Sequence, residues 1–384
     1  MNDNNKSKRI SIMNNVKILQ GDCIESMKGM EAGSVNCCVT SPPYFGLRDY
    51  GTATWKGGDP KCDHIEKHFK HGGERADRNQ DNQKFSYKGF CEKCGAISVD
   101  EQIGLEETPD AYVAKMVEVF REVKRVLRDD GTVWLNLGDS YCGYTSETPS
   151  KRDDSPIAAG TVESQENRAG RGDRTRAMMN GGIKPKDLIG IPWRIAFALQ
   201  ADGWYLRQDI IWHKPNPMPE SVTDRCTKSH EYIFLLSKSK KYYYDHKAIM
   251  EPAQYGEQHA KKATSWGTDR KHPNKANVEK YAHKGDNNTC SKMDDGSHGR
   301  NKRDVWTVNT NPYKGAHFAT FPPDLILPCI LAGCPEGGTV LDPFGGSGTT
   351  AEVSREHGRK SVLCELNKEY IPLIKKRLEQ QLLF

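Results

Sequence analysis

The stretch VLDPFGGSGTTAEV, residues 340–353, decides the fold. An apolar run ends at Asp342, turns through Gly-Gly-Ser-Gly and opens a helix at about Thr349. Glycines in such a turn let the backbone approach a ligand closely, and the first turn of a helix offers unpaired N–H groups. The turn lacks the G-x-G-x-x-G spacing of a dinucleotide site and the lysine of a phosphate-binding loop, so neither NAD nor ATP is the expected ligand.

An acidic residue closes the next strand-like run. The run at residues 361–366 carries Glu365, about twenty residues beyond the glycine-rich turn. A carboxylate at this place can accept hydrogen bonds from both hydroxyls of a ribose. The turn and the carboxylate together predict a nucleoside pocket.

Strand-like apolar runs alternate with helical patterns along the rest of the chain. We expect strands over 16–22, 34–40, 132–139, 206–214, 231–239, 339–344 and 361–366. Helices are expected after the N-cap Thr108 with Pro109 in the first turn, over 192–201, and from about Asn367. The segment DLILPCILAGCP at 324–335 is typical of a core helix. This alternation predicts an α/β fold with a mostly parallel sheet that helices cover on both faces.

A second motif, VTSPPYFGLRDYG at residues 39–51, follows the expected strand 34–40. Each proline fixes φ and removes a backbone N–H, so the turn holds carbonyl oxygens that no local amide can bind. The Ser-Pro-Pro-Tyr turn at 41–44 would stand at the carboxyl end of a strand, where open α/β sheets bind ligands. A rigid turn in which Tyr44 only packs is the alternative.

Both motifs resemble those of the β-group of site-specific DNA amino-methyltransferases. DPFGGSGTT at 342–350 resembles the S-adenosylmethionine motif of that family, and TSPPY at 40–44 resembles its catalytic motif. The catalytic motif comes first, which is the β-group order and implies a circularly permuted, Rossmann-like methyltransferase sheet. HFATFPPDLI at 317–326 and Gly21-Asp22 resemble the segments that lead into the cofactor motif and contact the adenine ring. The resemblance covers most of the chain outside two insertions.

The resemblance implies roles for single residues. Asp342 should lie near the methionine amine of the cofactor, Phe344 against its adenine or methionine part, and Glu365 at its ribose. Asp22 is expected at the adenine amino group, with a strand-end cap as the alternative, and Thr320 at the methionine carboxylate. The remaining expected cofactor residues are Gly345, Gly346, Gly348 and Thr349.

The resemblance also implies the chemistry. An exocyclic amine on a base is a poor nucleophile because its lone pair is delocalised into the ring. Two acceptors would draw the nitrogen towards tetrahedral geometry, and Ser41 Oγ and the Pro42 carbonyl are the expected pair, held still by Pro42 and Pro43. Tyr44 would stack on the base, which must first be flipped out of double-stranded DNA.

Three hypotheses about function stay open at this stage. Serine in the first catalytic position is associated in the family with cytosine N4 and aspartate with adenine N6, so cytosine N4 is expected and adenine N6 is the alternative. A catalytically silent, zinc-containing DNA-binding protein would be a different class. Methylation at cytosine C5 would need a thiolate, but Pro328-Cys329 lies in the expected core helix and this chemistry would leave Ser-Pro-Pro-Tyr without a role.

Metal-type residues form two close pairs near the catalytic motif. The expected ligands are Cys62, His64, Cys91 and Cys94. Such soft or borderline ligands in two close pairs suit tetrahedral zinc, and His68 or His71 could replace the histidine at 64. Free thiols in a chance pairing are the alternative. Because no open coordination position is evident, the zinc would be structural.

Polar insertions interrupt a single methyltransferase domain. The expected segments are a catalytic half at 14–140 with a zinc-binding insertion at about 56–98, a flexible insertion at 141–186, a continuation at 187–250, a target-recognition insertion at 251–304 and a cofactor-binding half at 305–384. The target-recognition insertion is basic with interleaved aromatic residues, which fits contacts to nucleic acid or a solvated loop. In the stretch after the strand 206–214, Lys214 and Arg225 are candidates for phosphate contacts or for ordinary salt bridges.

The amino-acid composition is compatible with a DNA-binding enzyme but does not by itself indicate one. The net charge of +5 permits a polyanionic partner, and the mean hydropathy of −0.76 indicates solvated segments between core elements. Neither a signal peptide nor a membrane span is indicated, and several of the 12 cysteines lie in apolar runs, as reduced thiols do, so we expect a cytoplasmic protein. Double-stranded DNA is the expected partner, and the resemblance allows a homodimer and a cognate restriction endonuclease.

Overall fold

The computed structural model describes residues 15–46, 54–64, 91, 93–99, 102–143, 182–252, 291–292, 298–310 and 321–380. Several expectations from the sequence lie outside these residues. They are the role of Thr320, the alternative ligands His68 and His71, and most of the two insertions expected at 141–186 and 251–304. No helix in the described part of the chain is both long and apolar enough to cross a membrane.

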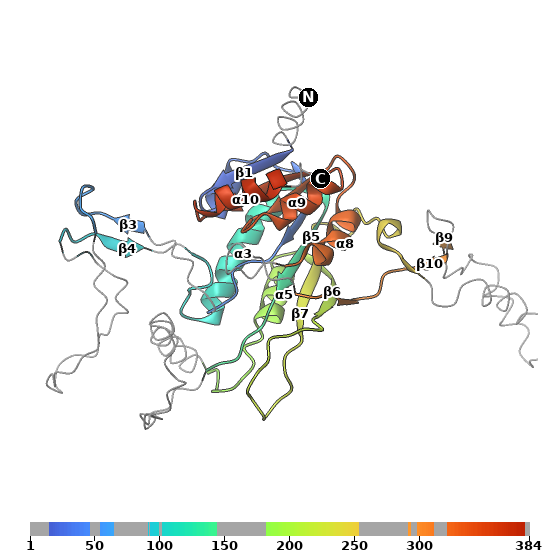
Figure 1. Ribbon diagram of the computed structural model, residues 1–384, viewed down its shortest axis with the longest axis horizontal. Helices are drawn as coiled ribbons and strands as arrows, with labels where there is room; N and C mark the ends of the chain where they lie inside the picture. Colours follow the sequence, from blue (N-terminus) through green and yellow to red (C-terminus); the bar gives the residue numbers. More distant parts are fainter. Residues whose placement is uncertain are drawn as a thin grey trace, which may run out of the picture.

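An eight-stranded sheet forms the centre of the molecule (Figure 1). Its strands, in spatial order, are β1 (Val16–Gln20), β13 (Lys360–Glu365), β12 (Thr339–Asp342), β2 (Val35–Thr40), β5 (Leu127–Leu137), β7 (His230–Ser237), β6 (Tyr205–His213) and β11 (Val305–Thr307). Only β7 runs antiparallel to its neighbours within this sheet. The α/β fold with a mostly parallel sheet is therefore confirmed.

Helices cover both faces of the sheet, as expected. They are α2 (Cys23–Lys28), α3 (Pro109–Val126), α5 (Ile191–Ala201), α8 (Pro323–Gly333), α9 (Thr349–Glu356) and α10 (Tyr370–Gln380). Side chains of α2, α3 and α5 share one apolar core with one face of the central strands, and α8 packs on the opposite face. The alternation of strand side chains produces this division, because Cys38 belongs to the first core while Cys37 and Val39 belong to the second.

Helix α3 shows how local sequence sets an element. Thr108 Oγ1 accepts a hydrogen bond from the Ala111 amide at 3.2 Å, and Pro109 occupies the first turn, where its missing N–H costs nothing. The helix passes directly into β5, so this strand begins five residues earlier than the sequence indicated. Gly131 lies within the strand, where a Cβ would come within 2.5 Å of Leu127 Cγ. The polar run before residue 132 hid the start of the strand.

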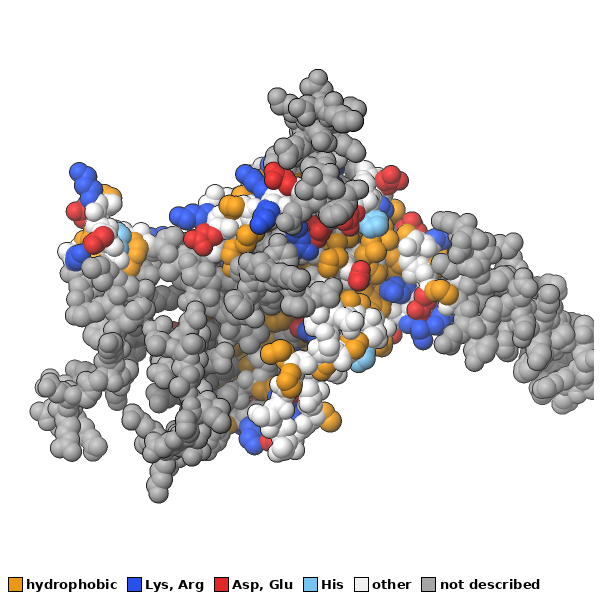
Figure 2. All heavy atoms as spheres, viewed as in Figure 1, with side chains coloured by type: hydrophobic (Ala, Val, Ile, Leu, Met, Phe, Trp, Pro, Cys, Tyr) orange, Lys and Arg blue, Asp and Glu red, His pale blue; other side chains and the backbone are white. Residues whose placement is uncertain are grey.

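Smaller strands were not expected from the sequence. β3 (Thr54–Lys56) pairs with β4 (Ile97–Val99), and a second small sheet joins β8 (Glu251–Pro252), β10 (His298–Arg300) and β9 (Ser291–Lys292). These strands have only two or three residues each, which is too short for an alternating pattern to stand out. Charges of both signs are interspersed on the face that Figure 2 shows, in keeping with the mild net charge.

Candidate active site

The two motifs meet at one edge of the sheet. β2 and β12 are neighbouring parallel strands with Cys38 opposite Leu341, so their carboxyl ends lie side by side. Thr40 Oγ1, at the end of β2, donates a hydrogen bond of 2.6 Å to Asp342 Oδ1, at the end of β12. This contact joins residues 302 positions apart and places the Ser-Pro-Pro-Tyr turn beside the glycine-rich turn.

Asp342 is the centre of this junction. Its side chain is almost fully buried, with 2% exposed, and burial raises the pKa of its carboxyl group. Oδ1 also accepts from the Phe344 amide at 3.0 Å, and Oδ2 accepts from Thr350 Oγ1 at 2.6 Å. One carboxylate therefore fixes the end of β2, the start of the glycine-rich turn and the first turn of α9.

The glycine-rich turn is shaped by close packing. Gly348 is the N-cap of α9 with φ of +82°, and a Cβ there would lie 2.9 Å from Ile374 Cγ2 of α10. A Cβ on Gly345 would lie 3.0 Å from Leu363 Cβ, and the Gly345 amide donates to the Cys364 carbonyl at 2.8 Å. These glycines are thus required by the protein's own packing, in addition to any approach of a ligand.

Acidic residues stand at the ends of the strands beside this turn. Glu365, at the end of β13, accepts from the Gly346 amide at 2.7 Å and from the Asn367 amide at 2.8 Å. Burial raises the pKa of Glu365 to about 7. Asp22, after β1, is the N-cap of α2 and accepts from the Glu25 amide at 3.0 Å, so it caps a helix and not the end of the strand.

The Ser-Pro-Pro-Tyr turn is held from two sides. Tyr112 of α3 donates its hydroxyl to the Pro43 carbonyl at 2.8 Å. The Gly46 amide donates to the Gly104 carbonyl at 2.9 Å, and a Cβ on Gly104 would lie 3.1 Å from the Tyr44 carbonyl oxygen. The turn that the two prolines stiffen is therefore also clamped to the neighbouring helix and loop.

The Tyr44 hydroxyl lies among polar groups. It donates to Glu231 Oε2 at 2.6 Å and lies 3.2 Å from Asn136 Oδ1. Burial and then the charge of Glu231 raise the pKa of Tyr44 well above its usual value, while a hydrogen bond with Ser41 acts in the opposite direction. Tyr44 is therefore a neutral phenol, and its hydroxyl is adjacent to the side chain of Ser41.

Two candidate phosphate contacts form ion pairs instead. Lys214 pairs with Glu231 at the inner end of the loop between β6 and β7, and Arg225 pairs with Glu220 at 2.6 Å within the same loop. The Arg225 guanidinium also lies 3.9 Å from the centre of the Tyr141 ring. The salt-bridge alternative is therefore what the structure shows for both residues.

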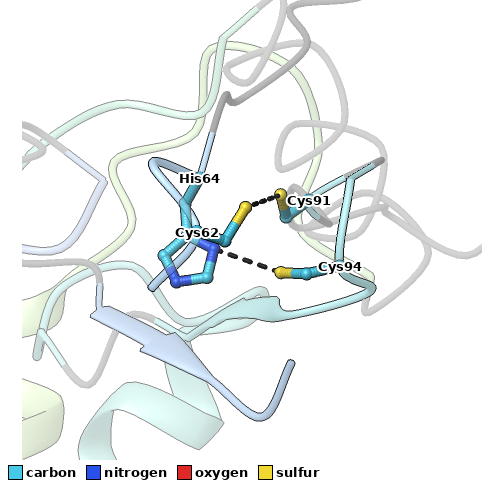
Figure 3. Close-up of side chains that lie close together, drawn as sticks. All are labelled: Cys62, His64, Cys91 and Cys94. Atoms are coloured by element: carbon cyan, nitrogen blue, oxygen red, sulfur yellow. Dashed lines mark hydrogen bonds between the residues drawn. The ribbon is translucent and has the colours of Figure 1, made fainter. Parts of the chain in front are cut away.

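The four expected metal ligands lie together (Figure 3). Cys62 Sγ lies 3.6 Å from Cys91 Sγ, His64 Nδ1 lies 3.3 Å from Cys94 Sγ, and all four ligand atoms are within 4.8 Å of one another. Tetrahedral zinc with bonds of about 2.0–2.3 Å separates its ligand atoms by roughly 3.3–3.8 Å. The two distances of 3.6 and 3.3 Å fall within this range, and all four residues lie between β3 and β4 in the sequence.

Tight turns hold the ligand pairs in place. Gly95 follows the Cys91–Cys94 pair with φ of +72°, and its amide donates to the Cys91 carbonyl at 2.7 Å. The Cys91 amide donates in turn to the Ala96 carbonyl at 2.7 Å. A Cβ on Gly58 would lie only 2.6 Å from Cys94 Sγ, so this position must stay a glycine for the cluster to close.

Together, these features define the class of the protein. A mostly parallel sheet carries a glycine-rich turn, three acidic strand ends and a Ser-Pro-Pro-Tyr turn along one edge, as expected of a Rossmann-like methyltransferase. The family model described as DNA methylase matches residues 35–376, so the chain belongs to the N6/N4 DNA methylase family.

Individual relatives support this assignment. The chain is 41% identical over 368 residues to the type II methyltransferase M.SmaI of Serratia marcescens, which covers 96% of this chain and 92% of the relative. It is 39% identical over 371 residues to the type II methyltransferase M.Cfr9I of Citrobacter freundii, with coverage of 96% and 89%. The solved structure of the cytosine-N4-specific PvuII DNA methyltransferase shares the fold, with a TM-score of 0.52, 14% identity and coverage of 96% and 90%.

Sequence reasoning missed part of the site. Asn136, Gly138 and Glu231 surround Tyr44, but no motif singled them out. One signal was available in the sequence. Gly138 and Asp139 end the expected strand at 132–139, and a glycine with an acidic residue at the end of a strand can mark a further part of a binding site. Glu231 had no signal in the sequence, because only the pairing of β7 with β5 brings it to Tyr44.

Proposed function

We propose that the protein transfers a methyl group from S-adenosylmethionine to N4 of a cytosine that is flipped out of double-stranded DNA. The hydrogen bond from Thr40 to Asp342 carries this proposal, because it places the Ser41–Pro42 turn directly beside the glycine-rich turn. A flipped base and a cofactor at these two turns would have their reacting atoms next to one another.

The residues of the chain have separate tasks in this proposal. The glycine-rich turn and Glu365 would hold the cofactor, which supplies the methyl group as a sulfonium. Ser41 Oγ and the Pro42 carbonyl would accept hydrogen bonds from the amine and aim its lone pair at that methyl group. Tyr44 would stack on the base. The methylated amine then loses its extra proton to water, so no dedicated base is needed.

Methylation at cytosine C5, which needs a cysteine nucleophile, is not supported at Cys329. Cys329 lies within α8 with 1% of its surface exposed, and burial raises the pKa of its thiol far above the usual value. A thiolate nucleophile needs the opposite conditions, namely exposure and a lowered pKa. The choice between cytosine N4 and adenine N6 rests on Ser41 in the first catalytic position, which favours cytosine.

The order of strands supports a circularly permuted methyltransferase sheet. The catalytic strand β2 precedes the cofactor strands β12 and β13 in the sequence, yet β2 lies beside β12 in the sheet. The expected catalytic half at 14–140 and cofactor half at 305–384 thus contribute adjacent strands to one sheet. Relatives that are type II methyltransferases support a site-specific enzyme with a cognate restriction endonuclease.

Cofactor affinity should depend on pH through Glu365. Ribose hydroxyls donate to the ionised carboxylate, and the raised pKa of about 7 means that protonation competes with this contact near neutrality. The affinity for S-adenosylmethionine should therefore rise about tenfold from pH 6 to pH 8 and then level off. Calorimetric titration measures this, with Glu365→Gln as the control because the cofactor's own amine titrates in both proteins. If the affinity of the variant depends on pH as strongly as that of the wild type, Glu365 does not bind the ribose.

We also propose that the cluster of Cys62, His64, Cys91 and Cys94 binds one structural zinc ion. The full-length protein, purified without chelators, should then contain about one zinc per chain by elemental analysis. Cys94→Ser should lower this content several-fold, whereas Cys226→Ser should leave it unchanged because Cys226 is an exposed thiol outside the cluster. A wild-type protein with almost no zinc after growth in zinc-supplemented medium would contradict the metal site.

Nucleoside analysis tests the proposed reaction. Unmodified DNA is incubated with the protein and labelled S-adenosylmethionine, digested to nucleosides and analysed by mass spectrometry. We expect N4-methylcytosine. N6-methyladenine would keep the mechanism and change the base, whereas no modified base despite binding of cofactor and DNA would leave a silent binding protein.

A further inference from the structure

We propose that Glu231 is a positioning residue that fixes the ring of Tyr44 for the flipped base. This inference rests on the proposed function and adds to it the part of the site that holds the base. The proposed reaction needs the Tyr44 ring in one orientation, yet the two prolines of the Ser-Pro-Pro-Tyr turn fix only its backbone. The side chain must therefore be held by groups from elsewhere in the fold.

Three strands supply these groups. Leu137 of β5 is paired with Tyr232 of β7, so Glu231 and Gly138 lie next to one another where β7 begins and β5 ends. The β6–β7 pairing sets Trp212 opposite Glu231. Because β7 is antiparallel to β5, its first residues lie at the same edge of the sheet as the catalytic turn.

Glu231 binds the Tyr44 hydroxyl at 2.6 Å and also accepts from Asn136 Nδ2 at 3.3 Å. Asn136 is itself fixed, because its Nδ2 donates to the Tyr232 carbonyl at 3.1 Å. The hydroxyl is thus tied to two strands, β5 and β7. A phenol held in this way can turn neither about its Cα–Cβ bond nor out of the site without losing buried hydrogen bonds.

Lys214 neutralises the charge of the largely buried Glu231 carboxylate. Its ammonium group pairs with Glu231 and lies 4.2 Å from the centre of the Trp212 ring, and the side chains of Lys214 and Glu231 are only 18% and 13% exposed. An unpaired charge would be costly here. The lysine that the sequence offered as a phosphate contact is thereby assigned to the support of Tyr44.

Gly138 also restricts the position of the Tyr44 ring. A Cβ on Gly138 would lie 2.6 Å from Tyr44 Cε2 and 3.3 Å from Glu231 Cδ. The ring therefore lies against the backbone at the end of β5, and any side chain at position 138 would displace it. Hydrogen bonds hold the hydroxyl end of the ring, and this contact holds its edge.

A double-mutant cycle tests the inference, with Glu231→Gln, Tyr44→Phe and the combined variant compared in DNA methylation. Tyr44→Phe keeps the ring and removes only the hydroxyl through which Glu231 acts. We expect each single variant to lower kcat about tenfold or more, the combined variant to be no slower than the slower single variant, and the dissociation constant for S-adenosylmethionine to stay within twofold in all three. Gly138→Ala should also lower kcat without changing cofactor binding.

The matched control is Glu122→Gln, which removes a partly buried acid that pairs with Arg125 at 2.9 Å on α3. It should leave kcat unchanged. Losses that multiply in the combined variant, or weakened cofactor binding in Glu231→Gln, would show a general structural role and overturn the inference. A fully active Glu231→Gln variant would overturn the inference alone, whereas a wild-type protein that methylates no DNA would overturn the proposed function and the inference together.

Discussion

A Ser41→Ala variant should methylate DNA about 10²–10³ times more slowly than the wild type while binding S-adenosylmethionine equally well. In the proposed reaction Ser41 would supply one of the two acceptors that orient the amine, and loss of one preorganised polar group at a reacting centre typically costs a factor of this size. The Pro42 carbonyl remains, so the variant should keep a small residual rate. Single-turnover transfer of a labelled methyl group measures both rates.

Cofactor binding is the control for this variant. Ser41 lies in the catalytic turn, outside the residues that would hold the cofactor, so a calorimetric titration should give the wild-type dissociation constant. A variant that transfers methyl groups at the wild-type rate would show that Ser41 is not one of the acceptors. A variant that no longer binds cofactor would show that the catalytic turn supports the cofactor site instead.

An Asp342→Ala variant should lose measurable cofactor binding together with stability. Thr40, Thr350 and the Phe344 amide would all lose their buried acceptor. We expect the free energy of unfolding to fall by roughly 2–5 kcal/mol, because each orphaned buried donor costs about 1–3 kcal/mol and the groups can relax in part. Urea denaturation measures the change in stability, and calorimetry measures the loss of binding.

Asp342→Asn separates the two effects. The amide keeps the shape and one acceptor oxygen, so the loss of stability should be smaller than in the alanine variant. Its NH₂ group, however, cannot accept a hydrogen bond from a threonine hydroxyl, so the glycine-rich turn should bind cofactor more weakly than in the wild type. An alanine variant as stable as the wild type would contradict the view that this carboxylate joins the two motifs.

Much of the fold could be predicted from local patterns. The turn after Asp342 and the cap at Thr108 each combine a change of hydrophobic period with residues of special backbone preference, and both stand where expected. The edge strand β11 could not be predicted, because three residues carry no period and its stability comes from pairing with β6. The start of β5 was missed because the charged residues 128–130 follow Leu127 and interrupt the apolar run.

The site was predicted less completely than the fold. Spacing predicted Glu365 and the family resemblance predicted Asp342 as cofactor-binding residues, but neither could show that their oxygens also accept hydrogen bonds from the protein. The hydrogen bond between Glu231 and Tyr44 could not be predicted from the sequence. Glu231 lies 187 residues from Tyr44 in the chain, and only the pairing of the antiparallel strand β7 brings the two together. The sequence predicted that Cys62, His64, Cys91 and Cys94 lie together, because two close pairs of cysteine and histidine ligands with such spacing are uncommon by chance.

A crystal structure of the protein with bound S-adenosylmethionine would test the central claim most directly, because it needs no knowledge of the DNA sequence that is recognised. We predict that the cofactor lies along residues 345–349 with its ribose at Glu365, and that its sulfonium methyl group points towards the space beside Ser41 and Pro42. A cofactor bound elsewhere, or one whose methyl group points away from the catalytic turn, would contradict the account.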